Sequence, residues 1–200
     1  MEPVRRVTGK AIPLNRANVD TDQIIPAKYL KRIERTGYGP FAFESWRADP
    51  DFVLNNPVYE GAPILIAQQN FGSGSSREHA VWALEGLGVR ALIAPSFADI
   101  FKHNCFQGGL LTVELPQEDV DYLLARAEEL PAAELAIDLE SQTVRTIDGS
   151  WERRFEIDAF KKYRLLRGLD DIAMTLEYSD DVAAFEGQRS ALLPTTPAGD

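Results

Sequence analysis

The segment Asn70–His79 concentrates residues that can bind an anion. It contains two glycines, three serines and one arginine within ten residues. Glycines allow close approach to the backbone, Ser75 and Ser76 supply hydroxyl donors, and Arg77 supplies a planar guanidinium that can bind a carboxylate through two parallel hydrogen bonds. This combination predicts a local site for a carboxylate or a phosphate group.

The same residues do not match three common motifs for phosphate binding or nucleophilic catalysis. A dinucleotide-binding fingerprint requires a third glycine at the position of Arg77, and a Walker loop requires a Gly-Lys-Ser/Thr run that is absent. A nucleophile elbow requires a glycine at Glu78 if it is centred on Ser76, or at Arg77 if it is centred on Ser75. The pattern therefore argues against a nucleotide-binding loop and against a serine hydrolase.

The flanking residues predict that this segment joins a strand to a helix. Residues 62–67 form a short apolar run typical of a strand buried on both faces, and apolar residues recur at helical spacing after the segment. Ser75 and Glu78 fit a capping box at the start of the helix. Because a helix N-terminus presents free N–H groups and the positive end of the helix dipole, we expect an anion, admitted by Gly72 and Gly74, to bind there.

Strand and helix patterns alternate along the rest of the chain and predict one α/β domain. A polar loop is expected at residues 15–23. The expected strands are residues 4–13, 91–94, 110–115, 135–139, 143–147 and 153–157, and the expected helices are residues 96–101, 117–129, 159–166 and 172–176. The domain should extend over residues 1–189, whereas residues 190–200 have little to bury and are expected to form an unstructured tail.

Composition and charge argue against several classes of function. The 200-residue chain has 21 Lys and Arg against 31 Asp and Glu, a formal net charge of −10, so we expect no nucleic-acid partner. Residues 1–6 lack the apolar core of a signal peptide, and no apolar run approaches the ~20 residues that span a bilayer, so we expect a cytoplasmic protein without a membrane partner. The single cysteine, Cys105, excludes an internal disulfide, and two histidines leave too few ligands for a structural zinc site.

A cluster of basic residues stands out in this acidic chain. Its members are Lys28, Lys31, Arg32 and Arg35. They precede residues 36–40, whose glycines and proline predict a mobile surface turn. On charge alone the cluster fits a solvated surface and a substrate-facing surface equally well.

Four motifs in the same order resemble those of the aconitase superfamily. Residues 74–80, Gly-Ser-Ser-Arg-Glu-His-Ala, resemble the signature loop of its mobile, or swivel, domain. Residues 18–26, 50–55 and 94–101 resemble stretches of the small subunits of bacterial 3-isopropylmalate dehydratases, and the resemblance covers the chain apart from its C-terminal tail. It implies an α/β fold of the aconitase type, a swivelling β/β/α three-layer domain.

The resemblance also implies a reaction and a partner. Members of this family interconvert 2-isopropylmalate and 3-isopropylmalate through 2-isopropylmaleate in leucine biosynthesis, so both steps move water across a double bond. In the family a [4Fe-4S] cluster with one open iron site acts as Lewis acid. Such a cluster needs three protein thiolates and this chain has one cysteine, so the resemblance implies a heterodimer in which a large subunit holds the cluster. This chain would be inactive alone.

Within the signature loop, the resemblance assigns roles by position. Ser75 matches the catalytic base, an alkoxide that takes a proton from the carbon next to a carboxylate, and Ser76 and Arg77 would bind carboxylate oxygens of the small dicarboxylate substrate. The helix N-terminus and Arg77 would favour the alkoxide. Asp22 matches an acidic active-site residue that would orient Ser75, Arg77 or the substrate, although a role as a turn former explains it equally well.

The basic segment holds a second group of expected site residues. The loop with Tyr29, Leu30 and Lys31 lies where related enzymes choose between substrate side chains. Leu30 and Lys31 are therefore expected to bind substrate, with Leu30 against the isopropyl group.

Some positions depart from the bacterial pattern or invite other roles. Ser73 stands where cysteine is common, and Val81 stands where proline often opens the helix. His79, in the first helical turn, is expected to be a structural hydrogen-bonding residue, and Cys105 is expected to pack as a small hydrophobic residue.

Related functions stay open at this point. A small subunit of a hydro-lyase for methylmalate and citraconate, or of the homoaconitate type, would carry the same loop, and a noncatalytic anion-binding module would also fit it. We expect the face with Gly72–Arg77 to dock on the large subunit, because a cluster there must reach a substrate held by Arg77.

Overall fold

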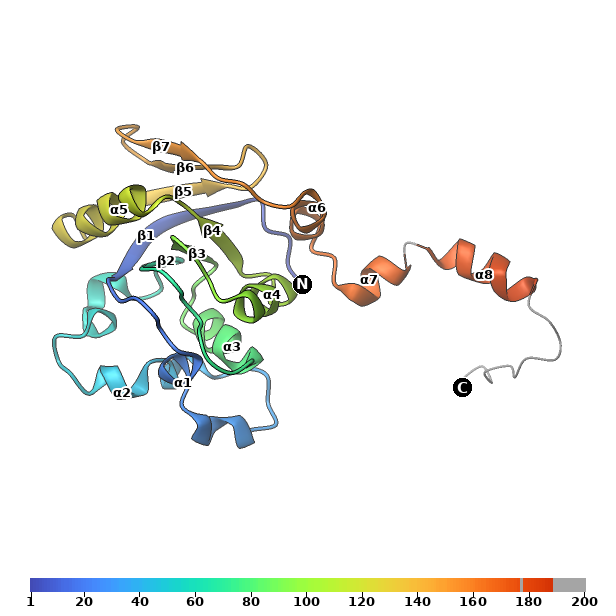
Figure 1. Ribbon diagram of the computed structural model, residues 1–200, viewed down its shortest axis with the longest axis horizontal. Helices are drawn as coiled ribbons and strands as arrows, with labels where there is room; N and C mark the ends of the chain where they lie inside the picture. Colours follow the sequence, from blue (N-terminus) through green and yellow to red (C-terminus); the bar gives the residue numbers. More distant parts are fainter. Residues whose placement is uncertain (177, 189–200) are drawn as a thin grey trace. The chain divides into compact units, whose positions relative to one another are not determined.

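The computed structural model describes residues 1–176 and 178–188 and divides the chain into two compact units, Met1–Gly168 and Leu169–Asp200. The strands of the first unit are β1 (Arg6–Leu14), β2 (Ile64–Ala67), β3 (Ala91–Ala94), β4 (Leu111–Glu114), β5 (Glu134–Asp138), β6 (Thr143–Thr146) and β7 (Glu152–Arg154). They form one sheet in the order β4-β3-β2-β1-β5-β6-β7 (Figure 1). The predicted α/β class is confirmed.

Strand β1 joins two differently built halves of this sheet. Its residues 11–14 pair in parallel with β2, whereas its residues 6–10 pair antiparallel with β5. Strands β2, β3 and β4 continue the parallel half, and β5, β6 and β7 continue the antiparallel half. Gly9 lies in the antiparallel part of β1, where a Cβ atom would come within 2.7 Å of the Pro63 ring, so this close approach requires glycine.

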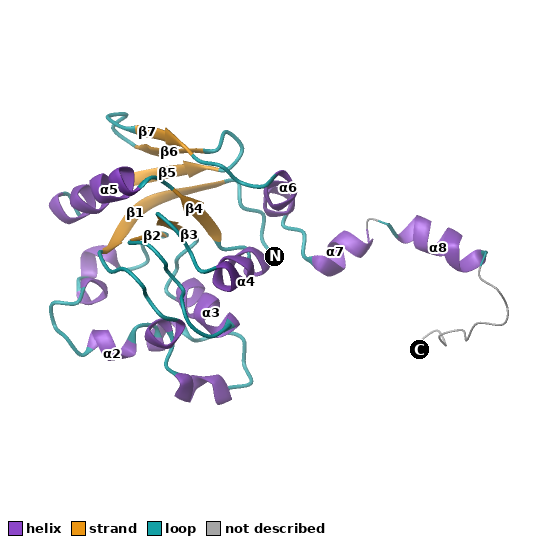
Figure 2. Ribbon diagram, viewed as in Figure 1, coloured by secondary structure: helices purple, strands orange, loops and turns teal. Residues whose placement is uncertain are grey.

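Helices connect the parallel strands, as parallel pairing requires (Figure 2). Helix α3 (Glu78–Gly86) joins β2 to β3, and α4 (Asp99–Gly108) joins β3 to β4. Helix α5 (Gln117–Glu129), which has the bounds that the apolar spacing predicts, packs against β1 and β2. The predicted succession of a strand at 62–67, a helix after the serine-rich loop and a strand at 91–94 is confirmed.

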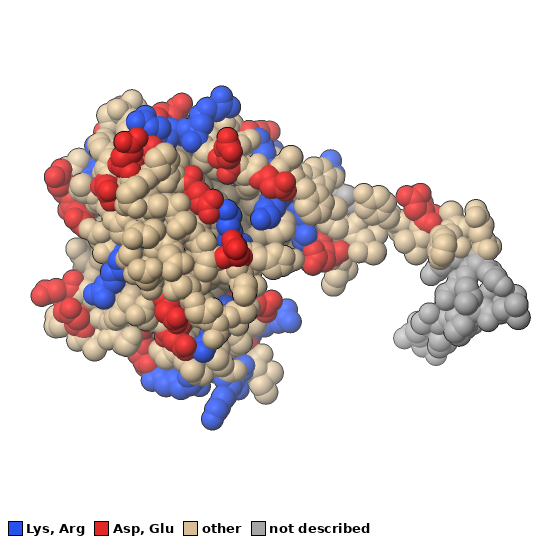
Figure 3. All heavy atoms as spheres, viewed as in Figure 1, with Lys and Arg blue, Asp and Glu red and all other residues tan. Residues whose placement is uncertain are grey.

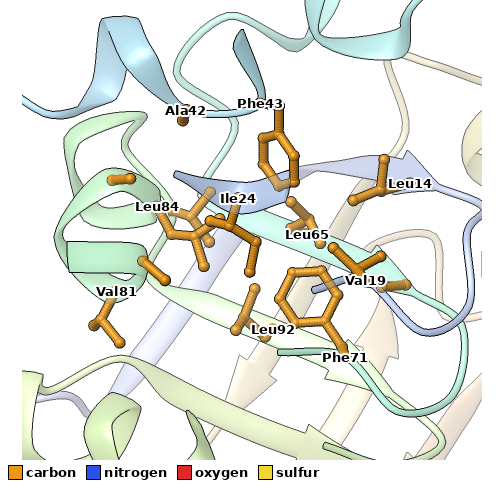
Figure 4. Close-up of a cluster of buried hydrophobic side chains, with 14 of the residues drawn as sticks. Leu14, Val19, Ile24, Ala42, Phe43, Leu65, Phe71, Val81, Leu84 and Leu92 are labelled. Carbon is orange, nitrogen blue, oxygen red and sulfur yellow. The ribbon is translucent and has the colours of Figure 1, made fainter. Parts of the chain in front are cut away.

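Alternate residues of the central strands face two separate apolar cores. Ile12 and Leu65 belong to one core with α3, whereas Ala11 and Ile64 belong to the other with α5. Figure 4 shows the first core, in which Phe71 converges with side chains from the sheet and from the loops before β2. Fully burying one such large apolar side chain stabilises a fold by roughly 1.5–3 kcal/mol. This core therefore anchors the loops that follow β1 and β2.

The other described elements are short turns before β2 and helices after β7. They are α1 (Thr21–Ile24), η1 (Ala27–Lys31), η2 (Gly39–Phe41), α2 (Glu44–Arg47), η3 (Val53–Asn55), η4 (Pro57–Tyr59), α6 (Ala159–Arg167), α7 (Asp171–Leu176) and α8 (Ser179–Gly187), where η marks a 3-10 helix. Among residues 1–176 and 178–188, no helix has the length and apolar character to cross a membrane. The tail expected at residues 190–200 lies outside the described residues.

Two expectations about helix starts are wrong. Ser75 does not cap α3, because the helix begins at Glu78 after Arg77, whose backbone is extended, and the start has no side-chain cap. The helix expected at residues 96–101 begins instead at Asp99 and runs to Gly108. Ser96 is used elsewhere, since its hydroxyl accepts a hydrogen bond from the Asn70 backbone N–H at 3.0 Å. For Ser96, a contact with a residue distant in sequence thus replaces the local capping pattern.

Candidate active site

Three loops meet at the carboxyl ends of the parallel strands β1, β2 and β3. Asn70, which has a left-handed backbone with φ +58°, links all three. Its side-chain N–H donates to Asn18 Oδ1 at 2.9 Å, and its backbone N–H donates to Ser96. Open α/β sheets form their ligand sites at this edge. The topology therefore places the loop Gly72–Arg77 where a site is expected.

The two glycines of this loop leave space for protein side chains. Gly72 has φ +80°, and a Cβ atom there would come within 2.6 Å of Phe101 Cβ. Gly74 has φ +91°, and a Cβ atom there would lie 2.8 Å from Asp20 Cγ and closer still to one carboxylate oxygen. Phe101 and Asp20 fill the side on which a Cβ atom would lie, so the packing of the protein itself requires these glycines; that they also admit the ligand stays a prediction.

The segment between β1 and α1 holds the loop by its backbone. The N–H groups of Gly72 and Ser73 donate to the Val19 carbonyl at 2.8 and 3.0 Å. Thr21 then binds the loop twice: its backbone N–H donates to the Ser73 carbonyl at 2.9 Å, and its hydroxyl donates to the Ser75 carbonyl at 2.9 Å. Residues some 50 positions apart in sequence thus form one unit.

The carboxylate of Asp22 binds the guanidinium of Arg77 in a two-pronged ion pair. One prong joins Arg77 Nη2 to Asp22 Oδ2 at 3.0 Å, and the other joins Arg77 Nη1 to Asp22 Oδ1. The Arg77 side chain is 14% exposed, whereas that of Asp22 is 50% exposed. The largely buried arginine thus presents its planar edge to a carboxylate at the surface, in the geometry that a substrate carboxylate would need. Asp20, rather than Asp22, forms the cap of α1.

The two serines of the signature loop differ in their contacts. Both are exposed. The Ser76 hydroxyl accepts a long hydrogen bond of 3.4 Å from the side-chain amide of Asn104, in α4. Within the described part of the chain, the Ser75 hydroxyl has no hydrogen-bond partner, so it is available to a ligand. The sequence analysis did not predict Asn104 at the site. The signal that could have identified it is its position in the helix that follows β3, at the same edge of the sheet.

His79 packs among aromatic rings. Its ring lies 4.6 Å from that of Trp82 and 5.4 Å from that of Tyr38, and burial lowers the pKa of His79. Burial therefore favours the neutral imidazole over its charged form. The expectation of a structural residue fits, but aromatic packing provides the contact, and no hydrogen bond to this ring is found among the described residues.

The remaining candidate ligands do not form a metal site. Cys105 is fully buried, and burial raises the pKa of its thiol well above the usual value, as expected for a packing residue. Within residues 1–176 and 178–188, no group of three or more His, Cys, Asp or Glu side chains could hold a metal ion.

The structure does not bring Leu30 and Lys31 into contact with the serine loop. Both lie in η1, where Leu30 is half-buried and Lys31 is exposed. Among the described residues, no hydrogen bond or ion pair joins η1 to Gly72–Arg77. Instead, Glu44 accepts a hydrogen bond from the Tyr29 hydroxyl at 2.5 Å and pairs with a neighbouring lysine. These contacts hold η1 against α2.

The basic cluster is only partly solvated. Lys28 pairs with Glu44 at 2.6 Å, and the Arg32 guanidinium lies 5.1 Å from the ring centre of Phe41. That of Arg35 lies 5.9 Å from the ring centre of Trp82, which is on α3. Figure 3 shows Lys and Arg side chains gathered at the lower edge of the view, over the segment that contains η1 in Figure 1.

Known proteins share this sequence and fold. A family model described as the aconitase C-terminal domain matches residues 1–118, and a second model, described as LeuD_N, matches residues 121–159. A 3-isopropylmalate dehydratase small subunit from Rubrobacter xylanophilus is 58% identical over 97% of this chain and 98% of its own length. Its counterpart from Acidothermus cellulolyticus is 52% identical over 99% of this chain and 100% of its own length.

A solved structure agrees with the sequence matches. The crystal structure of 3-isopropylmalate dehydratase from Methanocaldococcus jannaschii superimposes with a TM-score of 0.65 at 25% identity, covering 91% of this chain and 99% of that one. The resemblance seen in the motifs and the expected swivel-type fold are thus confirmed. The chain belongs to the aconitase C-terminal domain family and, within it, to the 3-isopropylmalate dehydratase small subunits.

Proposed function

We infer that this chain is the small subunit of a 3-isopropylmalate dehydratase, a hydro-lyase of leucine biosynthesis that works with a large subunit. The observation that carries this inference is the match to small subunits of that name over nearly the whole chain. The reaction removes water from 2-isopropylmalate and adds it back across the double bond of 2-isopropylmaleate to give 3-isopropylmalate. Each dehydration needs a base for a C–H proton and a site for the carboxylate next to that carbon.

Ser75 is the base in this proposal. Its hydroxyl is exposed and has no partner among the described residues, so nothing in the chain competes with a substrate for it. The start of α3 follows closely, and Arg77 lies two residues away. In this proposal the positive end of the α3 dipole favours the deprotonated serine that proton removal requires, and Arg77 adds only the charge that Asp22 does not offset.

Arg77 and Ser76 hold a substrate carboxylate in this proposal. The two-pronged contact with Asp22 supports this assignment, because it fixes the plane of the guanidinium near the surface and leaves its other N–H groups for a substrate carboxylate. Proton removal next to a carboxylate puts negative charge on that group, so a fixed guanidinium stabilises the product of the step more than its reactant. Asp22 orients Arg77, and Asn104 orients Ser76.

A [4Fe-4S] cluster does not fit this chain. The sequence has one cysteine, which is fully buried, whereas such a cluster needs three thiolates. We therefore propose that the large subunit holds the cluster and that the two chains form a heterodimer in the cytoplasm. The loop Gly72–Arg77, in which Gly74, Ser75 and Ser76 are exposed, would face the partner. Leu30 and Lys31 remain proposed contacts of the substrate side chain and carboxylate, which they would reach only in the assembled site.

Reconstitution tests the proposed function. The chain is mixed with a cluster-loaded large subunit of a relative, and hydration of 2-isopropylmaleate is followed by loss of its ultraviolet absorbance. We expect activity with both chains and none with this chain alone. Faster turnover of citraconate or of a homoaconitate-type substrate would assign a related hydro-lyase. No activity on any of them, with binding of dicarboxylates retained, would assign a noncatalytic anion-binding module.

A further inference from the structure

We propose that Thr21 is a positioning residue for the catalytic serine, Ser75. The proposal rests on the function proposed above, because it concerns the same loop. Thr21 is 1% exposed, and its hydroxyl donates to the Ser75 carbonyl at 2.9 Å. Its backbone N–H donates to the Ser73 carbonyl, also at 2.9 Å. One buried residue thus binds the loop on both sides of Gly74.

The position of these two bonds matters because of what lies between them. Gly74 has φ +91° and no side chain, so its backbone can rotate more freely than that of the serines on either side of it. If only the Ser73 carbonyl were hydrogen-bonded, the backbone dihedral angles of Gly74 could still change and move Ser75. The second tie, from the Thr21 hydroxyl, fixes the peptide group of Ser75 itself. Since the direction of the Cα–Cβ bond follows from the backbone of the same residue, this hydrogen bond fixes the position of the Ser75 Cβ atom, which carries the hydroxyl.

Thr21 is itself held by a rigid support. It is the first residue of α1, which a capping box closes: Asp20 accepts from the Asp22 backbone N–H at 2.7 Å, and the Asp20 N–H donates to Gln23 Oε1 at 2.9 Å. Ile24, in the same turn, is fully buried in the core that Figure 4 shows. The apolar core thus holds α1 in place, and the Thr21 hydroxyl of α1 in turn positions the backbone of Ser75.

Replacement of Thr21 by valine tests this role, because valine keeps the shape and the backbone N–H but removes the hydroxyl donor. Misplacing a reacting group by about 1 Å costs on the order of 100-fold in rate, so we expect kcat of the reconstituted enzyme to fall about 10- to 100-fold. KM should stay within about twofold, because Arg77, which binds the substrate in this proposal, is oriented by Asp22 and not by the Thr21 hydroxyl. Thr21→Ser restores the donor and should keep kcat within about threefold.

Thr146→Val is the matched control. Thr146 is also fully buried, and its hydroxyl accepts from the Trp151 backbone N–H at 3.1 Å, but it lies in the hairpin of β6 and β7. We expect Thr146→Val to lower the free energy of unfolding about as much as Thr21→Val does and to leave kcat unchanged. Hydrogen exchange of the isolated chain gives a second readout: amides of residues 73–77 should exchange faster in Thr21→Val, and at wild-type rates in Thr21→Ser and Thr146→Val.

Three results would overturn the proposal. The first is a kcat of Thr21→Val equal to that of Thr146→Val. The second is a loss of kcat in Thr21→Ser as large as that in Thr21→Val. The third is hydrogen exchange of residues 73–77 in Thr21→Val at the wild-type rate. If Thr21→Val does not fold, Thr21→Ala is measured in the same way, since a smaller side chain introduces no clash. Failure of the proposed function itself looks different, because the wild-type chain would then show no hydration of 2-isopropylmaleate with the partner.

Discussion

Replacing Gly74 with alanine should lower the free energy of unfolding of this chain by about 2–3 kcal/mol. Two effects add. Gly74 has φ +91°, and a left-handed backbone costs an L-residue roughly 1–2 kcal/mol. The new Cβ would also lie 2.8 Å from Asp20 Cγ, so the carboxylate must move away and give up its cap on α1, a loss of about 1 kcal/mol.

Urea denaturation of the isolated chain measures this free energy, with Gly61→Ala as the control. Gly61 has φ +67°, but nothing lies within 4 Å of a Cβ atom there, so only the backbone cost remains. The two variants should therefore differ by about 1 kcal/mol, the worth of the cap. In an Asp20→Ala background the difference should vanish, because the cap is already lost. Equal losses for Gly74→Ala and Gly61→Ala in the wild-type background would refute the reasoning.

Three further predictions concern the proposed catalytic residues and the pH dependence of stability. Ser75→Ala should lower kcat of the reconstituted enzyme by roughly 10²–10⁴-fold with little change in KM, as loss of a general base does, and a kcat within threefold of wild type would assign the base elsewhere. Asp22→Asn should raise KM for the dicarboxylate about fivefold, because Arg77 loses the carboxylate that orients it. Urea denaturation should show a change in unfolding free energy of only about 1 kcal/mol, because Asp22 lies at the surface and its pairing is screened by solvent; an unchanged KM would contradict this. Burial lowers the pKa of His79 in the folded chain, so its contribution to stability is present above the unfolded-state pKa of about 6.5 and is lost as the pH falls below it. Urea midpoints measured from pH 7.5 to 5 should fall in the wild type and in His103→Gln, the control at an exposed site, and should fall less in His79→Phe. An equal dependence of the midpoint on pH in all three proteins would exclude His79 as the cause.

The sequence predicts the central α/β unit because its signals are strong and local. Residues 62–67 and 91–94 are continuous apolar runs, and each forms a strand buried on both faces. Helix α5 follows from the apolar spacing of residues 117–129 alone. In these segments, propensity, periodicity and burial all favour the same structure, so no information from elsewhere in the chain is needed.

The details of the site depend on contacts that no local pattern contains. Ser75 has the right spacing for a cap of α3, but Thr21 binds its carbonyl from 54 positions away. Position 74 requires glycine because the Asp20 carboxylate occupies the space that a side chain would need. Asn104 reaches Ser76 because α3 and α4 follow the neighbouring strands β2 and β3. The motif thus identifies which residues form the site, whereas the reason for each residue's position comes from the fold.

The cross-linked loops at the sheet edge set limits on how members of this family can exchange parts. The Thr21 hydroxyl and the fit of Asp20 against Gly74 make residues 15–25 and 70–77 depend on each other's residue types, so a chimera that takes one segment from a distant relative should take the other with it. The segment around η1 has no hydrogen bond or ion pair with residues 72–77 within the described chain. If Leu30 and Lys31 contact the substrate as proposed, exchanging this segment between relatives would change substrate preference without breaking the hydrogen bonds that hold the serine loop.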